Sequence, residues 1–159
     1  AYTRRSKFRA KSFIRANPAS KIVRYDMGAA NKSDQFPVQL YLRSKTNLQI
    51  RHNAIESARQ VSNRVLEEQI GKGNYHLKIR IYPHHVLREN PLASGAGADR
   101  MSTGMQRSFG KCIGVAAQVR KGKQMFTIEV DDPHSDVARA ALKSAGHKFA
   151  CRTQIVQER

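Results

Sequence analysis

The chain has 159 residues, of which 40% are hydrophobic, and its 29 Lys and Arg against 12 Asp and Glu give a formal net charge of +17. This length suits a single domain, residues 1–159, and no apolar run approaches the roughly 20 residues that span a bilayer. So large a charge repels itself in a compact body unless a polyanion neutralises it. We therefore expect a soluble nucleic-acid-binding protein without a membrane partner and, since no signal peptide is evident, one inside the cell.

Residues 1–20 predict a basic arm, because cations dominate them and their few aromatic residues follow no helical or strand period. The alternative is a basic tail that orders only on RNA. A short strand is expected at residues 21–25. The candidate RNA-binding cations of this region are Arg4, Arg5, Lys7, Arg9, Lys11, Arg15, Lys21 and Arg24.

The first half of the body predicts a strand and then a helix. Residues 38–43 alternate apolar and polar side chains, as half-buried strands do, and residues 48–50 extend or re-enter the same sheet. Apolar residues at spacings of three and four between 54 and 70 then predict an amphipathic helix. A capping-box variant of Asn53 and Glu56 begins this helix and Gly71 ends it.

Three polar residues lie off the apolar stripe of that helix, namely Arg59, Asn63 and Arg64. They either face solvent or contact phosphates, and the pattern does not decide between these readings.

The second half predicts three strands and a second helix. Residues 76–82 form the clearest strand, and residues 113–119 and 126–130 are expected to pair as a hairpin around the basic turn 121–123. A helix follows, with Ser135 as its N-cap and Gly146 at its end, and a last strand covers residues 152–156. These elements predict an α+β fold of two layers, with a mixed, mostly antiparallel sheet, two helices on one face and the other face free for a partner.

Neither a cofactor nor a metal is expected. Acids and His134 crowd residues 131–136, but acids at a helix N-terminus explain them better than a metal site. Cys112 and Cys151 are too few for a disulfide framework, and we expect both to be reduced and buried.

The stretch from residue 83 to 111 is glycine-rich, basic and too long for an ordinary connection. It fails as a phosphate-binding enzyme loop, because five residues separate Gly104 from Gly110 and Cys112 stands where a P-loop has Ser or Thr. No nucleophile elbow occurs, so no catalytic residue is assigned.

The adjacent histidines 84 and 85 point opposite ways on an extended chain, which favours hydrogen bonds to phosphate or base over a shared metal. Together with the basic residues around them, they complete the expected RNA-binding set. Its members outside the arm are Arg80, His84, His85, Arg88, Lys121 and Lys123.

Two segments, YPHHVLREN (82–90) and GAGADRMSTGMQRSFGK (95–111), closely resemble the large-subunit ribosomal protein family called L-sixteen in bacteria and L-ten-e in archaea and eukaryotes. GAGADR alone would be a weak signal, but the similarity covers nearly the whole chain and looks archaeal. The further segments that carry it are AYTRR (1–5), KIVRYDMG (21–28), FPVQL (36–40), RHNAIESAR (51–59) and FGKCIGVAAQV (109–119).

The resemblance implies a hammerhead-type α/β fold and a structural, non-enzymatic role in the cytoplasmic large ribosomal subunit. Its implied place is in rRNA near the base of the central protuberance, with the arm threaded through rRNA and a role in late subunit assembly. The implied partners are large-subunit rRNA, tRNA, neighbouring ribosomal proteins and assembly factors. Family members usually extend further at both ends, so we expect missing terminal residues.

Within this family the loop reaches toward the peptidyl-transferase region and the acceptor arm of tRNA. The residues implied for that tRNA side are Arg100, Met101, Ser102, Thr103, Gly104, Met105, Gln106, Arg107 and Lys111. Two other readings of the loop stay open: a free-standing RNA chaperone, and an RNA-modifying enzyme that uses the loop as a lid.

Overall fold

The structure, a computed structural model, describes residues 3–4, 13–14, 17–89 and 111–158. Its larger sheet has five strands in the order β10-β4-β9-β6-β3, and every neighbouring pair in it is antiparallel. These strands are β3 (Asp26–Gly28), β4 (Val38–Ser44), β6 (Tyr75–Ile79), β9 (Gln124–Val130) and β10 (Thr153–Glu158).

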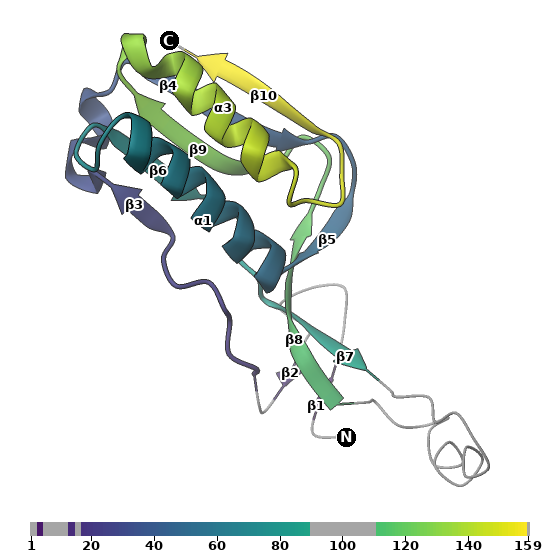
Figure 1. The fold of residues 1–159 in the computed structure, drawn as a ribbon. Helices are drawn as coiled ribbons and strands as arrows, with labels where there is room; N and C mark the ends of the chain where they lie inside the picture. Colours follow the sequence, from purple (N-terminus) through teal and green to yellow (C-terminus); the bar gives the residue numbers. More distant parts are fainter. Residues whose placement is uncertain (1–2, 5–12, 15–16, 90–110, 159) are drawn as a thin grey trace, which may run out of the picture.

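Two helices, α1 (His52–Gln69) and α3 (Ser135–Gly146), cover one face of this sheet (Figure 1). The two helices pack against each other, and small residues of both, such as Ala58 of α1 and Ala141 of α3, are fully buried. Small side chains let two helices approach closely, and the layer between helices and sheet is filled by side chains such as Leu40 and Leu66. The expected α+β class with two helices on one face is confirmed.

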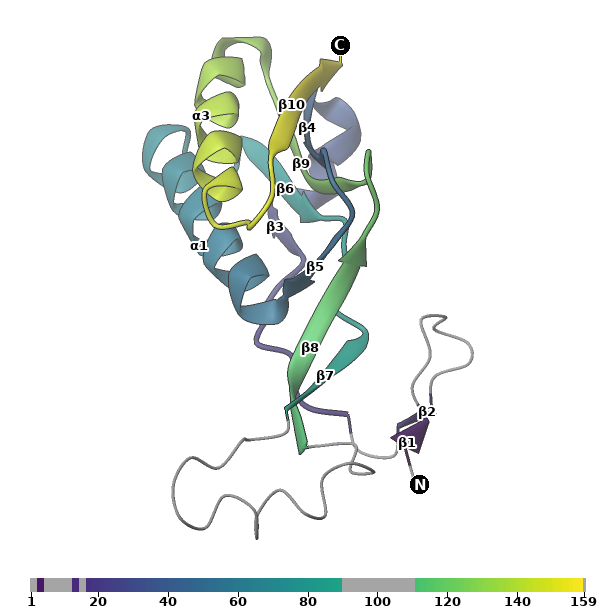
Figure 2. The ribbon, with the colours of Figure 1, turned by 90° about the vertical axis from the view of Figure 1, so that its right-hand side faces the viewer.

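A second sheet has three strands in the order β5-β8-β7 and projects away from the helices (Figures 1 and 2). Its strands are β5 (Leu48–Arg51), β7 (His85–Glu89) and β8 (Lys111–Val119). The prediction of a single sheet was therefore wrong, because residues 48–50 pair with β8 and not with the larger sheet. Near the N-terminus, β1 (Thr3–Arg4) pairs with β2 (Phe13–Ile14).

The expected hairpin between residues 113–119 and 126–130 was also wrong. β8 and β9 belong to different sheets, and the turn between them bonds instead to the end of β4. The Gly122 N–H donates to the Ser44 carbonyl (2.7 Å), and the Ser44 N–H donates to the Lys123 carbonyl (3.1 Å). These bonds direct β9 alongside β4 while β8 continues into the second sheet.

The stretch expected as a loop from residue 83 begins as a strand. β7 pairs with β8 so that Glu89 lies opposite Lys111. The two strands form a ribbon, and Glu89 and Lys111, the residues that flank segment 90–110, are neighbours at its tip. Residues 90–110 themselves lie outside the described residues, as do residues 5–12 and 15–16 of the arm.

Several element boundaries differ from expectation. Residues 21–25 are not assigned to a strand, and β3 starts at Asp26. Ser135 is the first helical residue of α3 and not its cap. α1 begins at His52 without a capping side chain. The expected ends are confirmed, since Gly71, with φ +90°, follows α1 and α3 stops at Gly146.

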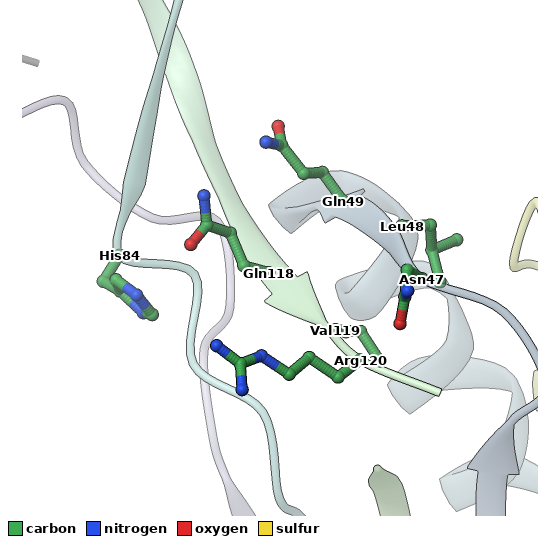
Figure 3. A pocket seen from close by; sticks show the side chains of 7 residues that line it. All are labelled: Asn47, Leu48, Gln49, His84, Gln118, Val119 and Arg120. Carbon is green, nitrogen blue, oxygen red and sulfur yellow. The ribbon is translucent and has the colours of Figure 1, made fainter. Parts of the chain in front are cut away.

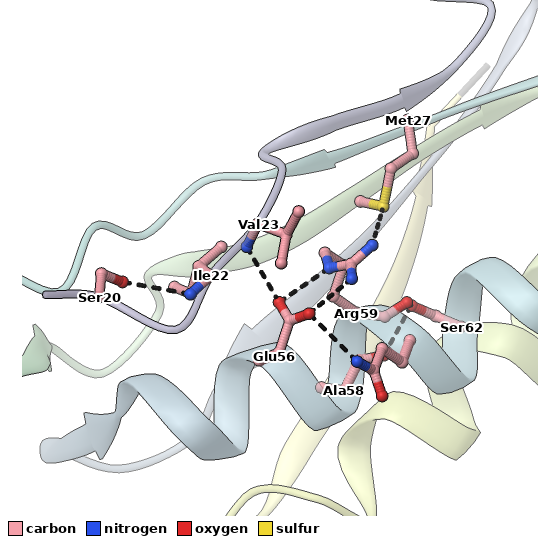
Figure 4. Close-up of polar contacts among 9 residues, drawn as sticks. Ser20, Ile22, Val23, Met27, Glu56, Ala58, Arg59 and Ser62 are labelled. Carbon is pink, nitrogen blue, oxygen red and sulfur yellow. Dashed lines mark hydrogen bonds and ion pairs between the residues drawn. The ribbon is translucent and has the colours of Figure 1, made fainter.

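The expected capping residue Glu56 instead anchors the extended segment 17–25 to α1 (Figure 4). Its carboxylate accepts hydrogen bonds from the Val23 N–H (3.3 Å) and from the Arg59 Nε (2.9 Å). The Arg59 hydrogen bond lowers the pKa of Glu56 against the effect of burial, and the Val23 N–H lowers it further. One buried carboxylate thus holds the chain where the arm meets the body.

A substitution at Gly28 tests the edge of the larger sheet. Gly28 has φ +83°, and an added Cβ would overlap the carbonyl oxygen of Tyr75, which accepts the Ala29 N–H (2.8 Å). We expect Gly28→Ala to lower the free energy of unfolding by more than about 3 kcal/mol, measured by urea denaturation. The control Gly122→Ala has the same φ but nothing within 4 Å, and should cost about 1–2 kcal/mol. Equal costs would contradict the assigned contact.

A second substitution tests the anchor through its pH dependence. A carboxyl whose pKa is lowered by folding stabilises the fold above its unfolded pKa of about 4.3, and this stabilisation is lost as the pH falls through the folded pKa. We expect Glu56→Gln to cost about 1–3 kcal/mol at pH 7 and progressively less toward pH 3, measured by urea denaturation.

The matched control is Glu68→Gln, which removes an exposed ion pair with Arg64 (2.8 Å) and should leave the free energy of unfolding close to that of the wild type, because water screens such pairs. A Glu56→Gln cost that does not change with pH would contradict the anchor.

Candidate nucleic-acid interface

The sheet face opposite the helices was expected to be free for a partner, but its charges are largely paired with one another. His76 is buried, with Nδ1 2.8 Å from Glu129 and Nε2 3.1 Å from Asp26. Arg43 lies 3.7 Å from Glu158, and Lys78 lies 3.9 Å from Asp26. Acids on this face repel phosphates and occupy the nearby cations, so it is a poor surface for RNA.

Unpaired cations gather instead where three turns meet at the end of β4. The Lys45 N–H donates to the Arg152 carbonyl (3.0 Å), and the Lys121 N–H donates to Asn47 Oδ1 (2.7 Å). Within the described part of the chain, no carboxylate forms a salt bridge with any cation of this group, and each is exposed. We call the group the turn cluster; its members are Lys45, Arg120, Lys121, Lys123 and Arg152.

A pocket of about 480 Å³ opens beside the turn cluster (Figure 3). Its polar side chains come from the start of β5, the end of β8 and the residue before β7. They are Asn47, Gln49, His84, Gln118 and Arg120. Hydrogen-bonding groups and one guanidinium thus surround this space, and none of its lining residues is acidic.

The arm side of the body carries a second cationic area around His52. Lys21, Arg24 and Arg51 are exposed, and the Lys21 N–H donates to His52 Nδ1 (3.4 Å). Burial lowers the pKa of His52, and Lys21 and Arg51 lower it further, so the imidazole is neutral at pH 7. A neutral ring that accepts at Nδ1 carries its proton on Nε2.

His52 also contacts the ribbon. A Cβ at Gly114 of β8 would lie only 3.2 Å from His52 Nε2, so glycine at this position lets the ring reach the strand. Segment 17–25, α1 and the ribbon therefore meet at one side chain.

The structure brings together only part of the set predicted from the sequence. Lys121 and Lys123 lie in the turn cluster, and His84 lines the pocket. Arg80 Nε donates to Thr127 (3.1 Å), while His85 bonds to Gln118 (3.3 Å). Arg88 is half-buried in β7.

The other predicted arm cations and the tRNA-side residues 100–107 lie where side chains are not described, as does the side chain of Lys111.

Sequence reasoning missed Lys45, Arg120, Arg152 and the two glutamines of the pocket. A signal for the cations was present, since each of the three flanks a strand. Their positions in the sequence do not show that the three turns lie next to one another.

The helix residues left open by the sequence have structural partners. Arg59 bonds to Glu56, Asn63 Oδ1 accepts the Tyr75 hydroxyl (2.6 Å), and Arg64 pairs with Glu68. The expected burial of both cysteines was wrong, since Cys112 is exposed and Cys151 only partly buried.

Among the described residues, no cluster of three or more His, Cys, Asp or Glu side chains could hold a metal ion. In the same part of the chain, no helix has the length and apolar character needed to cross a membrane.

The chain is similar over nearly its whole length to known ribosomal proteins. The family model for ribosomal protein L16p/L10e matches residues 1–156. The chain is 45% identical over its whole length to large ribosomal subunit protein uL16 of Methanoculleus marisnigri, covering 89% of that protein. The Methanococcus aeolicus uL16 is 47% identical over 98% of this chain and 86% of its own. The chain belongs to the ribosomal protein L16p/L10e family, with archaeal relatives.

Proposed function

We propose that this chain is a structural, non-enzymatic constituent of the large ribosomal subunit in the cytoplasm, and that it binds rRNA. The observation that carries the proposal is the turn cluster, where exposed cations gather and no acid in the described part of the chain forms a salt bridge with them. Lysine and arginine neutralise phosphates regardless of sequence and release counterions as they do so. The relatives named large ribosomal subunit protein uL16 support the choice of rRNA as the polyanion.

Two RNA-facing parts act together in this proposal. The first part is the turn cluster at the end of β4. The second is the arm, whose cations continue through Lys21 and Arg24 to the point where the bond between Val23 and Glu56 holds the chain against α1. Contacts at two separate places fix the orientation of the body on folded RNA more firmly than either place alone.

The finer role concerns segment 90–110. In this proposal the protein binds rRNA near the base of the central protuberance. The segment extends from the ribbon toward the peptidyl-transferase region, where residues 100–107 and Lys111 contact tRNA. The pairing of Glu89 with Lys111 supports this, because the two residues that flank the segment lie at the ribbon tip and not in the body. Late entry during subunit assembly, with assembly factors and neighbouring ribosomal proteins as partners, belongs to the same proposal.

The salt dependence of rRNA binding tests the turn cluster. We expect the triple variant Lys45→Ala/Lys121→Ala/Lys123→Ala to reduce the slope of log affinity against log salt by about 2 to 3, because each lysine neutralises roughly one phosphate. This slope is measured by filter binding to Methanoculleus marisnigri large-subunit rRNA at KCl concentrations from about 50 to about 300 mM.

The matched control, Arg64→Ala/Lys78→Ala/Arg139→Ala, also removes three cations, each bonded to a side chain of the body. Its slope should stay close to that of the wild type. A control slope reduced as much as that of the turn-cluster variant would show that only net charge matters.

Deletion of residues 101–108 tests the finer role. We expect the urea midpoint of the isolated protein and its incorporation into large subunits to be unchanged, while tRNA binding by those subunits or their final maturation is impaired. Sucrose-gradient sedimentation and a tRNA filter-binding assay measure the two effects. Loss of the fold on deletion would contradict this division between body and segment.

A further inference from the structure

The pocket beside the turn cluster has the groups needed to recognise more than a phosphate. Gln49 and Gln118 lie directly opposite each other on β5 and β8, and both are exposed. Directly opposed residues of an antiparallel pair point to the same side of the sheet. Two carboxamides are therefore presented side by side at one wall of the pocket (Figure 3).

The hydrogen bonds around these amides determine which of their atoms a ligand can use. Gln118 Nε2 donates to His85 Nδ1 (3.3 Å), which leaves Oε1 as an acceptor. Asn47 Oδ1 accepts the Lys121 N–H (2.7 Å), which leaves Nδ2 as a donor. Among the described residues, the Gln49 amide bonds to no other side chain, so it offers both a donor and an acceptor.

A cation and an imidazole complete the pocket. The Arg120 side chain extends from the end of β8 along the same space (Figure 3), and it is exposed. His84 Nδ1 lies 3.0 Å from the Tyr82 carbonyl, an acceptor, so Nδ1 carries a proton and Nε2 is the nitrogen left for a ligand.

This combination fits one class of ligand. Carboxamides match the paired donors and acceptors on the edge of a nucleobase, and a guanidinium matches a phosphate. Such edges are accessible in RNA where a base is unstacked, because side chains cannot enter the narrow major groove of an RNA duplex. A pocket of about 480 Å³ lies within the range of small-ligand sites.

We propose that this pocket binds one unstacked nucleotide of the rRNA, with the amides of Gln49 and Gln118 on the base edge and Arg120 on its phosphate. The inference rests on the proposed function, since it requires rRNA to lie on the turn cluster. It adds base recognition at this place to contacts that otherwise read only backbone charge.

The double variant Gln49→Ala/Gln118→Ala of the full chain tests the pocket. The probe is deproteinised Methanoculleus marisnigri large-subunit rRNA, treated with base-specific chemical reagents with and without protein. We expect the wild type to protect an unpaired base that the variant leaves reactive. The variant should bind about tenfold more weakly with an unchanged salt slope, because no charge is removed. Arg120→Ala should also lose the protection, and should lower the slope by about 1.

The matched control is Gln69→Ala/Gln154→Ala, which removes two exposed amides outside the pocket and should protect the same bases as the wild type. The urea midpoints of all variants verify folding, and Gln49→Glu, which keeps the side-chain size, gives a second readout of the same protection. If the wild type binds the rRNA specifically and the pocket variants protect the same bases as the control, the pocket proposal is overturned while rRNA binding stands. If the wild type itself binds no more tightly than to an unrelated RNA, the proposed function fails first.

Discussion

The arrangement of this protein depends on the first turns of α1, where two side chains hold segment 17–25 to the body. His52 accepts the Lys21 N–H, and Glu56 accepts the Val23 N–H. The four residues from His52 to Glu56 rise about 6 Å along the helix, and the two residues from Lys21 to Val23 span about 6.6 Å of extended chain. The two spacings match, so alternate backbone N–H groups of the segment reach successive turns of the helix. His52 also lies so close to β8 that a Cβ at Gly114 would be 3.2 Å from its Nε2, so the same turns of α1 adjoin the ribbon.

The distribution of charge follows from how each element is used. Cations on the sheet face opposite the helices pair with acids of the body, as Lys78 does with Asp26. Among the described residues, no carboxylate forms a salt bridge with the turn cluster, whose cations come from connections without acidic residues. An excess of charge that the body does not neutralise is available to a polyanion. The net charge of +17 therefore indicates a partner, while the pairing pattern indicates where that partner lies.

The sequence predicted the local elements well, because burial on one face imposes a period of 2 or 3.6 on residues such as those of β4 and α1. Prediction failed where contacts between residues distant in the sequence determine the structure. The turn at Gly122 looked like a hairpin, but two backbone hydrogen bonds join it to Ser44 at the end of β4. Glu56 looked like a capping residue, but Val23 and Arg59 bind its carboxylate. For the candidate site, Lys121 and Lys123 were predictable from a basic turn, whereas Lys45 and Arg152 join them only through the pairing of β4 with β9 and β10.

The most direct test of the central claim, that rRNA covers the turn cluster and leaves the paired sheet face free, is lysine acetylation footprinting read by mass spectrometry. The reactivity of each lysine in the free protein is compared with its reactivity in assembled large subunits. We expect Lys45, Lys121 and Lys123 to lose reactivity on assembly while Lys78 retains it. Turn-cluster lysines as reactive in the subunit as in the free protein, with Lys78 protected, would contradict this claim.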